Sequence, residues 1–381
     1  MSEKLSNIRT RIDEIDRDLL ALFAERMHLS DEIAEIKRKN NISLVDPKRE
    51  EAILQRVFET TSPDLRGEAV TLMRSFMAMS KSRQRTRLYG TPDELHFPGP
   101  TPPATKDVTV AYQGVPGSWS EVAVRKLFSG ITSTSQEDYE DVFVAVKDLK
   151  ATYGVVPIEN SAFGGVGEVY DLLRKYGCYI VGQTWVPTEY ALAALPGTKI
   201  EDIRTVCASD KAFKLCKRFL RGRHWQYTTC RNFAESAARV HQTPVGETAA
   251  IVSTRAAQVA GLSILSPNIS PNSDDRTRYI VIAASPEYDE SCDTVSITFL
   301  TSHKSGALVD ALFPLMSGDI NMKRLESRPM SDGRYYFFCD LEGNIGREAV
   351  ANALQNAAAR CSYMEILGCY LDDTPIRQVH S

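Results

Sequence analysis

Three polar residues, Glu159, Asn160 and Ser161, directly follow the apolar run "VVPI" at positions 155–158, and the stretch "AFGGVGEVYDLL" comes after them. The apolar run is typical of a buried strand and the later stretch of a helix, so the polar residues mark the carboxyl end of a strand. Open α/β sheets bind ligands at that end. The stretch contains no histidine or cysteine. An ordinary capped turn is the alternative interpretation.

A second group of polar residues lies on a predicted helix near the start of the chain. Arg26 and Lys37 are eleven residues apart, which places them about 20° apart around a helix axis and roughly 16 Å apart along it. They can therefore line one anion-binding pocket. Arg9 lies about 100° round and roughly 25 Å away from Arg26, so it cannot serve the same pocket along one straight helix, but it could serve a partner's pocket. A solvated helix face is the alternative, because cations on long helices usually face water.

The elements that carry these cations form a predicted all-helical block over residues 1–89. Apolar residues recur every three or four positions from Leu5 to about Lys39, without glycine or proline, which predicts one helix about 50 Å long. Asp46 followed by Pro47 predicts the start of a second helix, and residues 65–89 predict a third. The long helix cannot bury its apolar stripe within so small a block, so we expect a partner chain to cover it.

Two further blocks follow this helical one. Residues 90–107 contain five prolines and are typical of an extended linker. Over residues 108–287, short β-rich runs alternate with helical stretches, which predicts a mainly parallel sheet with helices on both faces. Residues 293–381 have the order βαββαβ, which is ferredoxin-like. The chain is thus predicted to be multidomain.

Composition limits the possible function classes. The net charge is -4, with 43% hydrophobic and 25% charged residues, as in ordinary globular proteins. The acidic balance argues against a nucleic-acid binder that would use the basic stretch "KSRQRTR" at residues 81–87. The eight cysteines are scattered, which indicates reduced thiols and neither a disulfide framework nor a metal site. No apolar run is long enough to span a membrane, so we expect a cytoplasmic protein.

Residues 5–88 resemble the all-helical chorismate mutase domain. Eight polar residues match that family's set in order: Arg9, Arg26, Lys37, Asp46, Arg49, Glu50, Ser80 and Gln84. The resemblance implies that Arg26 and a partner's Arg9 bind the two carboxylates of chorismate. It also implies that Lys37 and Gln84 are the catalytic donors to the ether oxygen. The remaining four line the pocket, and the mutase is then a dimer with two shared sites.

Residues 108–285 resemble prephenate dehydratase in three motifs: "GVPGSWS" at 114–120, "VVPIENS" at 155–161 and "TRY" at 277–279. The resemblance implies two α/β subdomains, like those of solute-binding proteins, with the chain entering the second near residue 187 and returning near 265. It implies a catalytic hydroxyl on Thr277 and no cofactor. The expected substrate-binding residues are Ser118, Ser120, Glu159, Asn160, Ser161 and Arg278.

The chain departs from the dehydratase pattern at three places that bear on the second subdomain. "ASDKAFKLC" replaces the usual Ser-His-Pro-Gln motif at Asp210 and Lys211, Asn232 and Phe233 replace Ser-Thr, and Asp275 replaces an asparagine. These departures leave open a diverged dehydratase, a decarboxylase that does not aromatise prephenate, and an inactive domain that serves as an amino-acid sensor.

The last block resembles the ACT regulatory domain of dehydratases. "GALV" precedes a helix, and "ESRP" ends a strand. The resemblance implies a phenylalanine site between paired domains, formed by Gly306, Ala307, Leu308, Val309, Glu326, Ser327, Arg328 and Pro329. The whole pattern therefore predicts a bifunctional enzyme of phenylalanine biosynthesis, inhibited by its end product.

Overall fold

The computed structural model describes residues 2–40, 42–43, 46–89, 95, 97–104, 107–128, 130–243, 246–270, 275–330 and 332–372. They belong to two compact units, described separately below. The first comprises Met1–His96, Thr301–Gly318 and Asn352–Tyr363, and the second comprises Phe97–Leu300, Asp319–Ala351 and Met364–Ser381. No helix in the described ranges is both long enough and apolar enough to cross a membrane.

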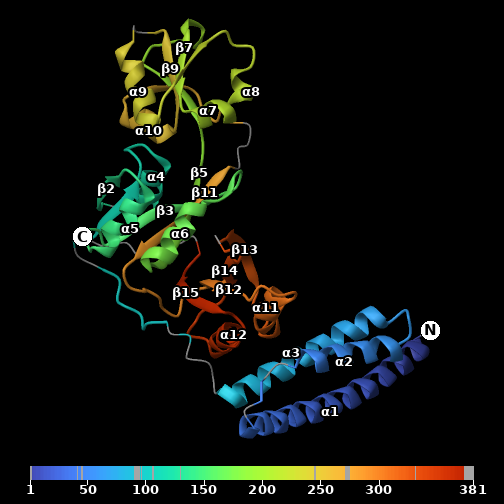
Figure 1. Cartoon of the computed structure of the whole chain (residues 1–381). Coiled ribbons are helices and arrows are strands. Elements are labelled where there is room, and N and C mark those ends of the chain that lie inside the picture. The colour runs from blue at the N-terminus through green and yellow to red at the C-terminus, as the bar shows by residue number, and fades with distance from the viewer. Residues whose placement is uncertain are drawn as a thin grey trace. The chain divides into compact units, whose positions relative to one another are not determined.

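The helical block consists of three helices, as predicted: α1 (Ser2–Asn40), α2 (Pro47–Thr60) and α3 (Arg66–Tyr89). Asp46 caps α2 by accepting a hydrogen bond from the backbone N–H of Arg49 at 3.1 Å, which confirms the predicted helix start. Figure 1 shows α3 running beside the second half of α1 and beside α2. The Phe23 and Phe76 rings, with centroids 5.7 Å apart, pack α1 against α3.

The first half of α1 keeps its apolar stripe uncovered. Five stripe residues are each 44–51% exposed: Leu5, Ile8, Ile12, Ile15 and Leu19. By contrast, Met27 and Ala34 on the second half are buried. Five aligned aliphatic side chains are costly to leave in water, so the prediction that a partner chain covers this stripe stays a prediction with a physical basis.

The second unit contains two α/β lobes. The first lobe has the sheet order β2-β1-β3-β11-β5, with β4 paired to β3, and the second has the order β10-β6-β9-β7-β8. The first-lobe strands are β1 (Thr109–Gln113), β2 (Thr132–Gln136), β3 (Tyr153–Asn160), β4 (Gly164–Gly165), β5 (Tyr179–Pro187) and β11 (Arg276–Ala283). The second-lobe strands are β6 (Ala191–Ala194), β7 (Thr205–Ala208), β8 (Gln226–Thr229), β9 (Thr248–Val252) and β10 (Ser263–Ser266).

The helices of the first lobe are α4 (Trp119–Leu127), α5 (Tyr139–Lys147) and α6 (Gly167–Tyr176). Those of the second lobe are α7 (Asp210–Leu215), α8 (Lys217–Leu220), α9 (Phe233–Gln242) and α10 (Thr254–Val259), with a short 3₁₀ turn at Ile200–Asp202.

Both sheets are mixed, so the prediction of a mainly parallel sheet was only partly correct. β1 pairs in parallel with β2 and β3, and β7 pairs in parallel with β8 and β9. β11 is antiparallel to β3 and β5, and β6 is antiparallel to β9 and β10. The reason lies in the path of the chain: it leaves the first lobe along β5 and must run the opposite way to return along β11. The return comes after residue 265, because β10 still pairs with β6 up to Ser266.

The C-terminal elements have the predicted βαββαβ order, and their strands form one sheet with the order β13-β14-β12-β15. The elements are β12 (Thr294–Leu300), α11 (Ala307–Ser317), β13 (Met322–Pro329), β14 (Tyr335–Glu342), α12 (Glu348–Ala358) and β15 (Tyr363–Tyr370). This sheet packs on the first lobe. Phe338 and Leu367 share one buried apolar cluster with Ile158, Tyr170 and Ile180 of that lobe.

Two candidate active sites

The helical block has a polar cluster centred on Arg26. The Arg26 guanidinium donates to the carbonyl oxygen of Phe76 at 3.0 Å and to the Ser80 hydroxyl, and its carbon lies 5.6 Å from the centroid of the Phe76 ring. Burial lowers the pKa of Arg26, yet an arginine remains charged in a protein. A partly desolvated cation held by α3 suits a carboxylate ligand.

Gln84 lies one helical turn beyond Ser80 on α3, and it is buried. Its side-chain oxygen has no hydrogen-bond partner among the described residues. An unpaired buried polar atom costs about 1–3 kcal/mol, which structural residues rarely impose. This oxygen can therefore accept a hydrogen bond from a ligand or from a group of another chain.

The other predicted mutase residues surround this cluster or lie apart from it. Lys37 is half-buried near the end of α1, on the face that carries Arg26. Glu50 forms an ion pair with Lys81 at 3.1 Å, which joins α2 to α3. Arg49 is exposed, and its backbone N–H donates to the Asp46 cap. Arg9 is exposed on the uncovered half of α1. Because α1 is one continuous helix, it holds Arg9 away from its own chain's cluster.

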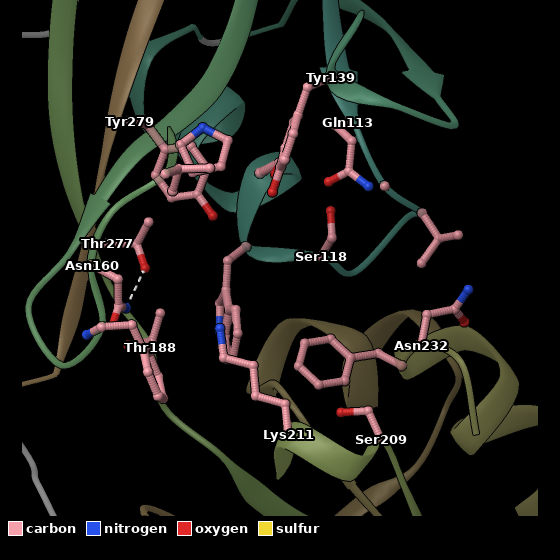
Figure 2. A pocket seen from close by; sticks show the side chains of 18 of the residues that line it. Gln113, Ser118, Tyr139, Asn160, Thr188, Ser209, Lys211, Asn232, Thr277 and Tyr279 are labelled. Carbon is pink, nitrogen blue, oxygen red and sulfur yellow. Dashed lines mark hydrogen bonds between the residues drawn. The ribbon is translucent and has the colours of Figure 1, made fainter. Parts of the chain in front are cut away.

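A cavity of about 670 Å³ lies between the two lobes of the second unit. This volume suits a small organic acid. Four of the predicted dehydratase residues line it: Ser118, Ser120, Asn160 and Thr277. Figure 2 shows three of them, Ser118, Asn160 and Thr277, around the cavity together with Gln113, Tyr139, Thr188, Ser209, Lys211, Asn232 and Tyr279.

Thr277 and Asn160 form the central pair of this site. The Asn160 side-chain nitrogen donates to the Thr277 hydroxyl oxygen at 2.8 Å (Figure 2). The Asn160 oxygen accepts from the backbone N–H groups of Ala162 and Phe163 at 3.0 and 3.2 Å, which fixes the orientation of the amide. Since the hydroxyl oxygen of Thr277 is already an acceptor, its own hydrogen can be donated to a substrate.

The second lobe contributes the positive charge. Among the residues that line the cavity, Lys211 and Arg231 are the cations, and Glu137 and Asp275 are the anions. The Lys211 ammonium lies 4.6 Å from the ring centroid of Phe163, which belongs to the turn after β3. The cavity walls desolvate this ammonium and lower its pKa. Lys211 of the second lobe thus contacts Phe163 of the first lobe, and its side chain lines the cavity.

Three of the predicted dehydratase residues lie elsewhere. Ser161 binds the backbone of Arg276: its hydroxyl accepts from the Arg276 N–H at 2.9 Å, which ties the end of β3 to β11. Glu159 and Arg278 point away from the cavity, toward the C-terminal sheet, where Glu159 pairs with Arg324 at 3.3 Å. The physical reason is strand alternation, since neighbours of Asn160 and Thr277 must face the other side of the sheet.

Several lining residues were absent from the sequence-based prediction, and two could have been found. Gln113 ends β1, so the strand-end argument that selected Asn160 applies equally to it. Lys211 stood out only as a departure from the family pattern. Tyr139 and Thr188 had no comparable signal, because their position depends on the packing of the two lobes.

The two predicted regulatory motifs begin a helix and end a strand, as expected. Gly306 precedes α11 with φ of 81°, a left-handed conformation that favours glycine. The "ESRP" residues close β13, where Arg328 pairs with Asp171 of α6 at 3.3 Å.

Comparison with known proteins identifies two catalytic domains in the chain. Residues 8–85 match the model of the type II chorismate mutase family, and residues 110–287 match that of prephenate dehydratase. The chain thus contains a chorismate mutase domain joined to a prephenate dehydratase domain.

The chain is 30% identical to the bifunctional chorismate mutase/prephenate dehydratase of Aquifex aeolicus, with 97% of this chain and 98% of that one aligned. It belongs to the family of bifunctional chorismate mutase/prephenate dehydratases.

Two solved structures share the fold of the larger part of the chain. One is a prephenate dehydratase from Arthrobacter aurescens in complex with L-Phe, with 26% identity, a TM-score of 0.63, and coverage of 70% of this chain and 92% of that one. The other is GqqA, described as a quorum-quenching acylase, with 27% identity, a TM-score of 0.64, and coverage of 71% and 100%.

Proposed function

We propose that the two clusters described above are the active sites of the chain's two activities. The chain is a chorismate mutase and a prephenate dehydratase of phenylalanine biosynthesis. The observation that carries the dehydratase assignment is the Thr277–Asn160 pair, which leaves a hydroxyl donor in a cavity that also contains Lys211. The partly desolvated Arg26, held by Phe76 and Ser80, carries the mutase assignment, with the buried Gln84 one helical turn beyond Ser80.

In the mutase reaction, chorismate rearranges to prephenate without a nucleophile or an external proton. Arg26 and Arg9 of a second copy hold the two carboxylates. Lys37 and Gln84 donate hydrogen bonds to the ether oxygen. As the C–O bond of that ether lengthens, negative charge grows on the oxygen, so these donors stabilise the transition state more than the substrate.

In the dehydratase reaction, prephenate takes up one proton and yields phenylpyruvate, carbon dioxide and water. Thr277 donates a hydrogen bond to the departing ring hydroxyl, and Lys211 with Arg231 binds the carboxylates at the other end of the molecule. The gain in aromaticity drives the reaction. A hydroxyl is a weak acid, so its contribution is orientation and charge stabilisation, and the proton comes ultimately from solvent.

The C-terminal sheet and its two helices form, in our proposal, an ACT-type regulatory module that binds phenylalanine. The βαββαβ order, the left-handed Gly306 before α11 and the "ESRP" end of β13 support this assignment. The dehydratase from Arthrobacter aurescens was solved with L-Phe, which supports the choice of ligand. Phenylalanine can inhibit only by binding the inhibited state more tightly than the active one.

One assay series tests these assignments. Chorismate and prephenate are supplied separately, with and without phenylalanine, and all products are identified. We expect prephenate from the first, phenylpyruvate from the second, and slower phenylpyruvate formation when phenylalanine is present. A non-aromatic product from prephenate would instead identify a decarboxylase, and no conversion of prephenate would identify a sensor domain.

Mixed dimers test whether each mutase site is shared between chains. We expect a dimer of one Arg9→Ala chain and one Arg26→Ala chain to have about half of the wild-type mutase activity, because one of its two sites receives both arginines. Each homodimeric variant should be nearly inactive. Differently tagged chains allow the heterodimer to be purified. An inactive heterodimer would show that Arg9 acts within its own chain.

A further inference from the structure

Arg278, the residue after Thr277 on β11, is a buried charge that the proposed reaction does not use. It is only 5% exposed. All three of its guanidinium nitrogens donate hydrogen bonds: to the side-chain oxygen of Gln183 at 2.5 Å, to the Asp340 carboxylate at 2.6 Å and to the Tyr370 hydroxyl at 3.0 Å. Burial alone would lower the pKa of Arg278, but Tyr370 and Asp340 raise it above its ordinary value.

The partners of Arg278 belong to two different sheets. Gln183 lies on β5 of the first lobe, whereas Asp340 and Tyr370 lie on β14 and β15 of the C-terminal sheet. Ser296 of β12 closes the network, with its hydroxyl 2.5 Å from Asp340 and 2.6 Å from the Tyr370 hydroxyl. Arg278 therefore connects β11 directly to β14 and β15 of the C-terminal sheet, and through Ser296 to β12.

The strand register ties this network to the catalytic pair. On β11 and β3, Thr277 lies opposite Asn160 and Arg278 lies opposite Glu159. The first pair faces the cavity, and the second faces the C-terminal sheet, where Glu159 binds Arg324 of β13 at 3.3 Å. The register between β11 and β3 shifts immediately after Arg278. The pairing of β11 with β3 near Arg278 thus depends on side chains that face the C-terminal sheet (the rear face) as well as on backbone hydrogen bonds.

The first lobe and the C-terminal sheet are closely packed against each other. A Cβ atom on Gly368 of β15 would lie only 2.0 Å from the backbone oxygen of Ile180 on β5, so the two strands approach closely there. The Tyr170 and Phe338 rings pack with centroids 4.6 Å apart across the same contact. Close-packed interfaces of this kind resist small displacements.

We propose that Arg278 is a positioning residue for the dehydratase reaction, which holds Thr277 in place by anchoring β11 to Asp340 and Tyr370 of the C-terminal sheet. This inference rests on the proposed function of the cavity. The C-terminal sheet is then a structural part of the dehydratase site, although none of its residues lines the cavity among those that the structure describes.

The test uses the full chain with Asp340→Asn, which keeps the shape but removes the nearer of the two carboxylates that pair with Arg278, at 2.6 Å against 4.0 Å for Glu159. The second variant is Tyr370→Phe, which keeps the buried ring but removes the hydroxyl. The matched control is Asp171→Asn, which breaks the exposed Arg328–Asp171 ion pair of the same interface without touching β11. We expect kcat for phenylpyruvate formation to fall about tenfold or more in Asp340→Asn, and several-fold in Tyr370→Phe, with KM changed less than about twofold.

Mutase activity should be unchanged in all three variants, and the control should keep wild-type dehydratase rates. If Asp340→Asn does not fold, Tyr370→Phe decides the outcome. Unchanged kcat in a folded Asp340→Asn or Tyr370→Phe variant would overturn the inference. So would an equal loss in Asp171→Asn, because the effect would then belong to the interface as a whole.

A double mutant tests whether the effect passes through Thr277. In a Thr277→Ala background, Asp340→Asn should cost much less than in the wild type, since the hydroxyl that the network positions is already gone. If the fold-losses in kcat of Thr277→Ala and Asp340→Asn instead multiply in the double mutant, the network acts on a group other than Thr277. Wild-type protein that makes no phenylpyruvate would contradict the proposed function instead. In that case, hydrogen exchange of the β11 backbone amides tests the anchoring by itself. Faster exchange in Asp340→Asn than in the wild type, with no change in Asp171→Asn, would support it, and equal exchange rates in all three proteins would refute it.

Discussion

Lys37→Ala should reduce the mutase kcat by at least about a hundredfold, because it removes a donor to the ether oxygen at the moment when charge develops there. The loss of one such donor typically costs roughly 3 kcal/mol of transition-state stabilisation. Lys37 lies on the Arg26 face of α1, where the cluster that involves Phe76 and Ser80 already binds α1 to α3. The measurement is the rate of chorismate consumption in purified protein at saturating substrate.

The matched control for this change is Lys39→Ala, which removes an exposed lysine two residues further along α1. It should leave both activities at wild-type levels. Dehydratase activity on supplied prephenate should survive in Lys37→Ala as well, since that reaction uses the other unit. Persistent mutase activity in pure Lys37→Ala protein would refute the assigned role of Lys37.

Thr277→Ala should lower kcat for phenylpyruvate formation by about a hundredfold to a thousandfold, comparable to the loss of one oxyanion donor. The substitution removes the hydroxyl that faces the cavity, and the Asn160 amide then keeps the more distant carbonyl oxygen of Arg276, at 3.5 Å, as an acceptor. Chorismate should still be consumed, so prephenate accumulates and can be measured by its acid-catalysed conversion to phenylpyruvate. Thr277→Ser should recover part of the rate, because it restores the hydroxyl.

Lys211→Met provides the contrast to Thr277→Ala within the same cavity. Removal of a carboxylate-binding cation should mainly raise KM for prephenate, by about tenfold, with a smaller change in kcat. Lys214→Met on the same short helix is the control, because Lys214 does not line this cavity. A fall in kcat with unchanged KM in Lys211→Met would mean that Lys211 acts in the chemical step and not in binding.

The departures from the dehydratase pattern gather mostly around the cavity between the two lobes. Lys211, Asn232, Phe233 and Asp275 all line the cavity. Asp210 does not; it accepts a hydrogen bond from the Thr229 hydroxyl at 3.0 Å. The side of the cavity formed by the first lobe keeps the family's Asn and Thr. We therefore expect the same chemistry with a different set of contacts to the carboxylates.

Local features of this protein could be predicted from sequence because they depend on neighbouring residues. The three-and-four spacing of Leu5, Ile8, Ile12 and Ile15 predicted α1, and Asp46 before a proline predicted the start of α2. In the same way, the change from apolar to polar residues after Ile158 located the end of β3, and with it Asn160.

Which face of a strand meets the cavity was decided only by the tertiary structure. Alternation along β3 and β11 requires Asn160 and Glu159, like Thr277 and Arg278, to point to opposite sides, but it does not say which side holds the cavity. The answer depends on where the second lobe and the C-terminal sheet pack, and residues far along the chain determine both. Asp340 and Tyr370, distant in sequence, cover the rear face, and so Arg278 is a buried anchor there while Thr277 faces the cavity.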